Sequence, residues 1–187
     1  MINLLSLWLP ILVSAVAVFA AGAVIHMVLP YHRSDTRKLP REDDVLDALR
    51  KFALPPDDYA APLADSMKEA RKPEFIAKQK AGPVFYLTVL PNGPSSMGKS
   101  LFLWFLNVLA VSLVAGLIAC RALRSTEAGF TAIMLFTGVT SFAGYSLGLL
   151  PHSIWYGRKW STTFKWIFDG LVNALVTALV FGWLWPR

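Results

Sequence analysis

Four long apolar segments constrain this chain most, and the last of them, Trp166–Trp185, is the most informative. Its 20 residues, as an α-helix with a rise of about 1.5 Å per residue, would be about 30 Å long, which matches the hydrocarbon core of a bilayer. Trp166 at one end and Trp183 and Trp185 at the other occupy positions where indole rings prefer the water–lipid boundary. The segment therefore predicts a membrane-spanning helix.

Three further apolar segments predict additional spans, at Ile2–Leu29, Leu101–Ala122 and Gly129–Leu150. Only 16% of the 187 residues are charged, whereas soluble domains carry about 25%. We therefore expect an all-α integral membrane four-helix bundle. It divides into a first transmembrane helix (residues 1–30), a cytoplasmic loop region of short interfacial helices (31–100) and a three-helix transmembrane region (101–187).

The first span lacks the basic n-region of a secretory signal peptide, because no Lys or Arg precedes Arg33. Its apolar run also exceeds the length of about 7–15 residues that is usual for such peptides. We expect an uncleaved anchor. Cleavage after the small residues at Ala20–Ala23 stays open as the alternative.

The polar region after the first span predicts short helices at Arg41–Phe52, Asp65–Arg71 and Pro73–Lys80, followed by an extended segment at Gly82–Pro91. Several basic residues here and beside the later spans are candidates for contact with anionic lipid headgroups. A solvated charged face is the alternative for those in the loop helices. The candidates are Lys68, Arg71, Lys72, Lys78, Lys80, Lys99, Arg158 and Lys159.

The basic residues are distributed unevenly between the two ends of the predicted spans. Of the 18 Lys and Arg residues, 15 lie in Tyr31–Ser100 and His152–Lys165, which share one side if there are four spans. Loops rich in Lys and Arg stay in the cytoplasm. The sequence thus predicts a bacterial inner-membrane protein with both termini in the periplasm.

The last span carries two stripes at intervals of four residues. Lys165, Asp169, Asn173 and Thr177 form a polar line, which is either a functional intramembrane centre or a set of interhelical hydrogen bonds. In the second alternative, Asp169 pairs with Lys165 on its own helix. Small residues that allow close helix packing form the second stripe and recur in the third span: Gly170, Ala174, Ala178 and Gly182, with Gly144 and Gly148.

No other motif predicts a site. Gly93–Ser100 satisfies the phosphate-loop expression GxxxxGK[ST], but the following helix is a membrane span and the loop lacks a buried parallel sheet, so we expect no nucleotide. Basic residues that flank spans make nucleic acid a poor partner. His26, His32 and His152 lack metal-ligand spacing, and Cys120 is the only cysteine. We expect no metal, no cofactor and no catalytic residue.

Two stretches, LPYHRSDTRKLPREDDVLDALR and SIWYGRKWSTTFKWIFDGLVNALVTALVFGWLWPR, resemble a family of small, four-span bacterial inner-membrane proteins that are usually called hypothetical. The resemblance implies a bacterial source and a cytoplasmic-membrane location, and it brings no catalytic or binding residues to carry over. We expect an accessory or structural subunit that contacts lipids and other membrane-protein subunits or a second copy of itself. The alternative is a small transporter or channel centred on Asp169. A lipid-headgroup enzyme near His32 and His152 is a third, weaker hypothesis.

Overall fold

The computed structural model describes residues 3–123 and 128–186, and 72% of the chain is helical. Four helical segments are long and apolar enough to cross a membrane. They are α1 (Trp8–Met27, preceded by the 3-10 turn η1, Leu4–Leu7), α5 (Met97–Leu123), α6 (Phe130–Ser146, continued by η3, Leu147–Leu149, and α7, Leu150–Tyr156) and α8 (Trp160–Leu184). This confirms the prediction of a helical, multi-pass membrane protein. Residues 1–36 and 96–187 form one compact unit, and residues 37–95 form another.

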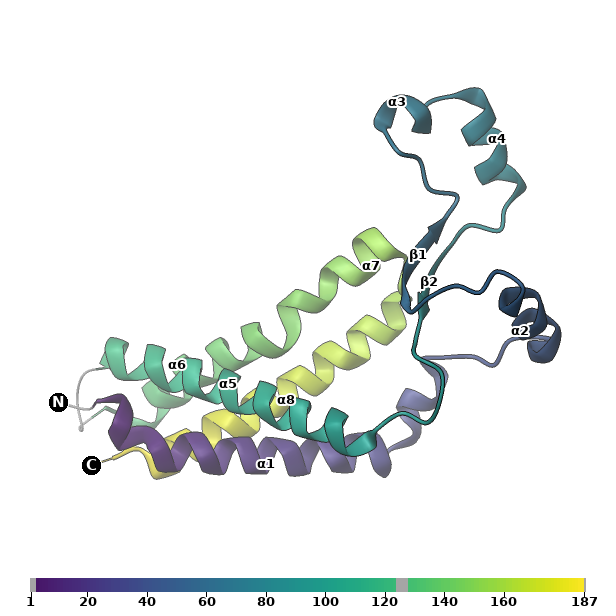
Figure 1. The fold of residues 1–187 in the computed structure, drawn as a ribbon. Helices are drawn as coiled ribbons and strands as arrows, with labels where there is room; N and C mark the ends of the chain where they lie inside the picture. The colour runs from purple at the N-terminus through teal and green to yellow at the C-terminus, as the bar shows by residue number, and fades with distance from the viewer. Residues whose placement is uncertain (1–2, 124–127, 187) are drawn as a thin grey trace. The chain divides into compact units, whose positions relative to one another are not determined.

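The four long helices pack against one another within the first unit. Helix α8 contacts α6 most extensively and also contacts α1, while α5 contacts both α1 and α6. The beginning of α1 and the end of α8 lie at the same end of the helices (Figure 1). The turn η2 (Pro30–Ser34) and the beginning of α8 therefore belong to the opposite end, where they contact each other.

The small-residue stripe of α8 faces α6. A Cβ atom added at Gly170 would meet Tyr145 and Ser146, one added at Gly138 would lie 3.2 Å from the Cβ of Ala178, and one added at Gly182 would meet the ring of Phe130. Because backbones that approach this closely exclude larger side chains, the stripe is an internal packing surface. The leucines of α8 point outward, as expected for a helix surrounded by lipid: Leu171, Leu175 and Leu179 are exposed.

The two glycines of the second small-residue motif, Gly144 and Gly148, have different surroundings. A Cβ atom on Gly144 would lie 3.2 Å from Cγ1 of Val111 on α5, so this glycine allows close approach of α5 and α6. A Cβ atom on Gly148 would meet nothing within 4 Å. Only the first residue of the predicted pair is therefore a packing position within the described residues.

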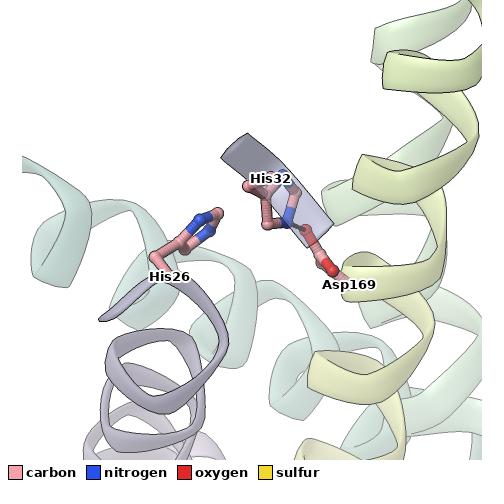
Figure 2. A group of neighbouring side chains, drawn as sticks. All are labelled: His26, His32 and Asp169. Carbon is pink, nitrogen blue, oxygen red and sulfur yellow. Dashed lines mark ion pairs between the residues drawn. The ribbon is translucent and has the colours of Figure 1, made fainter. Parts of the chain in front are cut away.

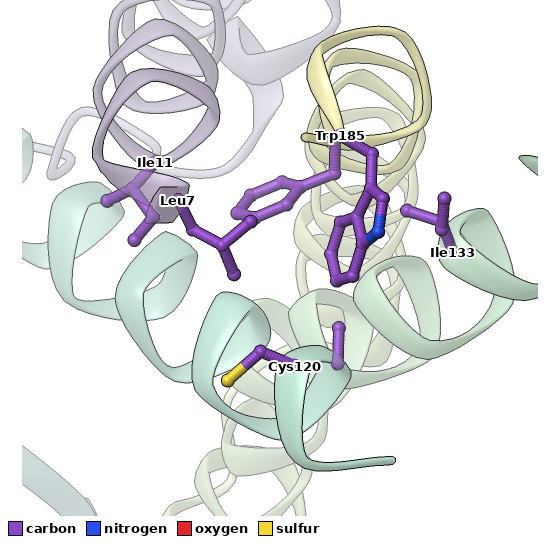
Figure 3. Packing of buried hydrophobic residues seen from close by; sticks show 7 residues of the cluster. Leu7, Ile11, Cys120, Ile133 and Trp185 are labelled. Atoms are coloured by element: carbon purple, nitrogen blue, oxygen red, sulfur yellow. The ribbon is translucent and has the colours of Figure 1, made fainter. Parts of the chain in front are cut away.

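An apolar cluster closes the helices at the end that holds the two termini (Figure 3). Leu7 and Phe181 are fully buried there, and Trp185 is 5% exposed. The indole of Trp185 packs with residues of α1, α5 and α6 in this cluster, whereas Trp183 is 73% exposed. The position of both rings at the water–lipid boundary stays a prediction.

Three predicted span boundaries differ by four residues or more from the structure. Helix α5 begins at Met97, before the predicted start at Leu101. The third span does not stop at Pro151, because this proline lies in the first turn of α7, where its missing N–H is not needed. Helix α8 begins at Trp160, six residues before the predicted span Trp166–Trp185 and one residue before Ser161, where the helix itself was expected to start. Gly157 explains this: its left-handed backbone (φ 66°) ends α7, and a new helix can start directly afterwards.

The second unit contains three short helices and a two-stranded sheet. The helices α2 (Glu42–Arg50), α3 (Met67–Ala70) and α4 (Pro73–Ala81) lie where the sequence predicts them. The extended segment is strand β2 (Phe85–Val89), which pairs antiparallel with β1 (Asp57–Ala61), a partner that was not predicted. The five basic residues predicted to contact headgroups here are exposed, and their contact with lipid stays a prediction.

Candidate functional site

A polar cluster lies at the end of the helical unit opposite the apolar cluster. It forms where Pro30 begins a turn after the first helix. Helix α1 ends at Met27, and Pro30 opens the turn η2, which brings the chain back over its own helix. His32 on η2 then stacks on His26 of α1 with ring centroids 4.6 Å apart. Figure 2 shows both imidazoles beside Asp169 of α8.

Asp169 is the acidic centre of this cluster and is only 4% exposed. Its Oδ2 atom lies 2.8 Å from Nε2 of His32, and its Oδ1 atom accepts a hydrogen bond from the hydroxyl of Tyr31. About nine residues separate it from the start of α8, or about 13 Å along the helix axis. A carboxylate at this depth is costly unless a cation or donors compensate its charge.

Lys165 holds η2 against α8. Its ammonium donates to the backbone oxygen of Tyr31 at 2.6 Å, to the Ser34 hydroxyl at 2.7 Å and to Oδ1 of Asp35 at 2.9 Å. The packing alternative for the polar line pairs Lys165 with Asp169, one turn further along the same helix. The structure pairs it with Asp35, because η2 supplies a carboxylate and two further acceptors to the same ammonium group.

Asp35 in turn orients His32. Its Oδ2 atom lies 2.7 Å from Nδ1 of His32 and accepts a hydrogen bond from Nε1 of Trp166 at 3.1 Å. Burial raises the pKa of Asp35, but hydrogen bonds from His32, Lys165 and Trp166, together with the charge of Lys165, outweigh it and lower the pKa to about 2. Asp35 is therefore an ionised acceptor for Nδ1 of His32, which leaves Nε2 facing Asp169.

Tyr31 completes the cluster as a donor. Burial and its hydrogen bond to Asp169 raise the pKa of Tyr31 above its ordinary value, so the phenol stays protonated. Trp166 lies beside both histidines, and the guanidinium of Arg158 lies 5.3 Å above its ring. Lys159 donates to the backbone oxygen of Ser34 at 3.0 Å. These two predicted headgroup residues therefore contact the protein, and their contact with lipid stays a prediction.

A cavity of about 210 Å³ continues from the cluster toward the middle of the helices. Its polar lining consists of His26, Asn107, Tyr145, Asp169 and Asn173. Within the described part of the chain, the side-chain oxygen of Asn173 is buried and has no hydrogen-bond partner, although such groups are normally paired. An unpaired amide oxygen in a cavity of this size is a position where water or a solute can bind.

The polar line predicted on α8 thus separates into parts with different environments. Lys165 belongs to the η2 contact, whereas Asp169 and Asn173 line the cavity. Thr177 donates to the backbone oxygen of Asn173 on its own helix at 2.9 Å, and its side chain also contacts Tyr145 of α6. The hydrogen bond of Thr177 therefore lies within α8, and the predicted interhelical hydrogen bonds account for neither Thr177 nor Asn173 among the described residues.

Sequence reasoning missed the approach of the two histidines. His26 was treated as isolated, and a meeting of His32 with His152 was considered only for the weaker enzyme hypothesis; His152 contacts Tyr156, with ring centroids 6.1 Å apart. His26, His32 and Asp169 place one potential metal-ligand atom each within 4.8 Å of one another. Pro30, between the histidines, was the available signal, because a proline just beyond a helix end favours a reversal of the chain.

The Gly93–Ser100 motif folds as the beginning of a helix. Met97 starts α5, the Ser96 hydroxyl accepts a hydrogen bond from the backbone N–H of Lys99 at 3.3 Å, and these residues are exposed. The strand that precedes the motif pairs antiparallel, whereas a phosphate loop follows a strand of a parallel sheet.

The chain matches no family model, no curated protein and no solved structure. The resemblance to small bacterial inner-membrane proteins therefore stays a prediction, and function has to be argued from the site.

Proposed function

We propose that the protein is a small membrane transporter that binds a cation at the cluster around Asp169. The observation that carries this proposal is the cavity, which joins a buried carboxylate to an unpaired amide oxygen and further polar groups inside apolar helices. Burial of such groups in lipid is costly, and it is typical of solute pathways. A protein that serves only as a packing partner does not need them.

Charge supports a cation as the solute. Lys165 is matched by Asp35 at 2.9 Å, so the negative charge of Asp169 is left with Tyr31 and His32 as its recorded polar contacts. Both partners are neutral when His32 is unprotonated, so Asp169 has no cationic group among its own contacts, and Arg158 and Lys159 contact Trp166 and the Ser34 backbone instead. A positively charged solute that enters the cavity would compensate the negative charge of Asp169.

The structure offers less support for the accessory function expected from the sequence than for transport. One of its two grounds was the small-residue stripe of α8, which α6 covers within the same chain. The other was the lack of a recognisable centre, and His26, His32 and Asp169 now form a candidate. A stoichiometric partner that co-purifies with the protein in mild detergent, without cation transport, would restore the accessory function.

The location is part of the same proposal. The uneven distribution of basic residues supports a bacterial inner membrane, with η2, the turn between α7 and α8 and residues 37–95 on the cytoplasmic side and both termini on the periplasmic side. The cavity would then receive its solute from the cytoplasmic side.

Transport is tested with the purified full-length chain in proteoliposomes that contain a fluorescent indicator. Uptake of K⁺, Mg²⁺ and Zn²⁺ is measured in turn. We expect Asp169→Asn to reduce uptake of the transported ion to the background of empty vesicles, because the substitution removes the buried charge. Asp47→Asn is the matched control, since Asp47 is exposed on α2 and should leave uptake unchanged.

Because Asp169→Asn can also disturb folding, Asn173→Ala is measured beside it. It changes the cavity without touching an ion pair and should also reduce uptake. Wild-type vesicles that take up none of the three ions, or folded Asp169→Asn protein with wild-type uptake, would contradict the proposal.

A further inference from the structure

The residues His26, His32 and Asp169 have the composition of a transition-metal site. They come from α1, η2 and α8, and their ligand atoms lie within 4.8 Å of one another. Two imidazoles and one carboxylate form ligand sets used by zinc and by non-haem iron, with a further position left open. Mg²⁺ and Ca²⁺ prefer oxygen ligands, so two imidazoles favour a d-block metal.

His32 also has the outer contact that metal-bound histidines usually have. Its Nδ1 atom lies 2.7 Å from Asp35, and Lys165 and Trp166 hold that carboxylate in place. Such a carboxylate fixes the tautomer of the imidazole and presents the lone pair of the other nitrogen to a metal. The nitrogen presented here is Nε2, which faces Asp169.

A second observation concerns the way in which these two atoms meet. Nε2 of His32 and Oδ2 of Asp169 are 2.8 Å apart, yet they are not aligned as an N–H···O hydrogen bond, and neither atom has another partner among the described residues. The Asp169 side chain is only 6% exposed. A buried nitrogen and a buried oxygen that converge without sharing a hydrogen bond are arranged as two ligands of one cation are.

We propose that His26, His32 and Asp169 bind one divalent transition-metal ion of the Zn²⁺ type. The inference rests on the proposed function, since it names the class of the cation. Metal–ligand distances of about 2.0–2.2 Å place tetrahedral ligand atoms about 3.4 Å apart, so the side chains must move by about 1 Å when the ion binds. The exposed His26 side chain at the end of α1 has the room to do so.

Two features would complete the coordination. The Tyr31 hydroxyl already contacts the other oxygen of Asp169 and supports the carboxylate from outside the ligand set. The cavity, lined by His26 and Asp169 among others, leaves space for water or a solute atom in the fourth position. An ion bound there would be reached from the end of the helices that carries η2.

Binding is tested on the purified full-length chain in detergent after treatment with a chelator. Co²⁺ is titrated and followed by its visible absorption, which reports nitrogen and oxygen ligands, and Zn²⁺ is then added to displace it. We expect one ion per chain for the wild type. His26→Gln, His32→Gln and Asp169→Asn should each weaken binding at least tenfold, and Asp35→Asn should weaken it by about 10–100-fold through His32.

His152→Gln is the matched control, because His152 lies on α7 against Tyr156 and outside the ligand set. It should bind Co²⁺ as the wild type does. His26→Gln keeps the test valid if the buried variants fail to fold, since His26 is exposed and its replacement should leave the melting temperature of the metal-free protein unchanged. Absence of Co²⁺ binding by the wild type, or equal binding by His26→Gln and His152→Gln, would overturn the inference.

The two proposals fail in different ways. If Asp169→Asn abolishes uptake of K⁺ or Mg²⁺ while the wild type binds neither Co²⁺ nor Zn²⁺, the metal site is wrong and transport stands. If the wild type binds the metal through the three residues but transports none of the ions tested, transport is wrong and the site stands.

Discussion

At the scale of single residues, Lys165 and Asp35 show how the centre is held together. One ammonium group joins α8 to three acceptors on and beside η2, and the carboxylate it contacts orients His32. The side chains of this pair are 24% and 13% exposed, so solvent screens their attraction only in part. Removal of one partner leaves the other charged group largely desolvated.

We therefore expect Lys165→Met to lower the free energy of unfolding by about 2–4 kcal/mol, near the lower end of the cost for breaking a buried pair. Lys159→Met is the control, because Lys159 is exposed and donates to the Ser34 backbone. It should cost less than about 1 kcal/mol. Equilibrium unfolding in mixed detergent measures both.

A double variant separates the ion pair from other effects of Lys165. Lys165→Met combined with Asp35→Asn should be less destabilising than the sum of the two single variants, because neither charge is then left alone. Additive costs would show that the pair does not couple α8 to η2.

At the scale of the elements, α8 buries polar side chains and exposes apolar ones, the opposite of a helix in a soluble protein. Its buried side carries Asp169, Asn173 and Thr177 together with the small residues, and its leucines point outward. Hydrocarbon around the helix explains this arrangement, since lipid accepts leucine as readily as a protein core does and helix association then depends on close packing.

The small-residue stripe of α8 gives a prediction at this scale. Gly182→Ala should destabilise the protein by about 1–3 kcal/mol, the usual cost of overpacking, because the added methyl group would lie 2.5 Å from the ring of Phe130. Gly148→Ala is the matched control and should be neutral or slightly stabilising, since a Cβ there meets nothing within 4 Å. Thermal melting in detergent compares the two variants. Equal melting temperatures would show that α6 and α8 approach less closely.

Apolar length and polar spacing were enough to predict the four spans and the inward side of α8. The interval of four residues places Asp169 and Asn173 on one face, whichever helix lies opposite. The meeting of His26 with His32 was not predictable in the same way, because it depends on the turn at Pro30. The approach of the two histidines to Asp169 also requires α1 to pack against α8, and these segments are more than a hundred residues apart in the sequence.

At the scale of the whole molecule, the uneven distribution of basic residues predicts the direction of insertion. In a Cys120→Ala background, Lys68→Cys in the second unit should react with a membrane-impermeant maleimide only after intact bacteria are permeabilised. Asn3→Cys, exposed near the beginning of the chain, should react without permeabilisation. The opposite pattern would place the basic loops in the periplasm and would contradict the proposed location.

The apolar cluster of Leu7, Ile11, Phe181 and Trp185 has a mechanical consequence for transport. If the protein transports a cation as proposed, an ion at Asp169 would meet a closed end, because Phe181 and Trp185 are buried in the apolar cluster at the other end of the helices. Crossing would then require α1 and α8 to separate near Leu7 and expose those rings.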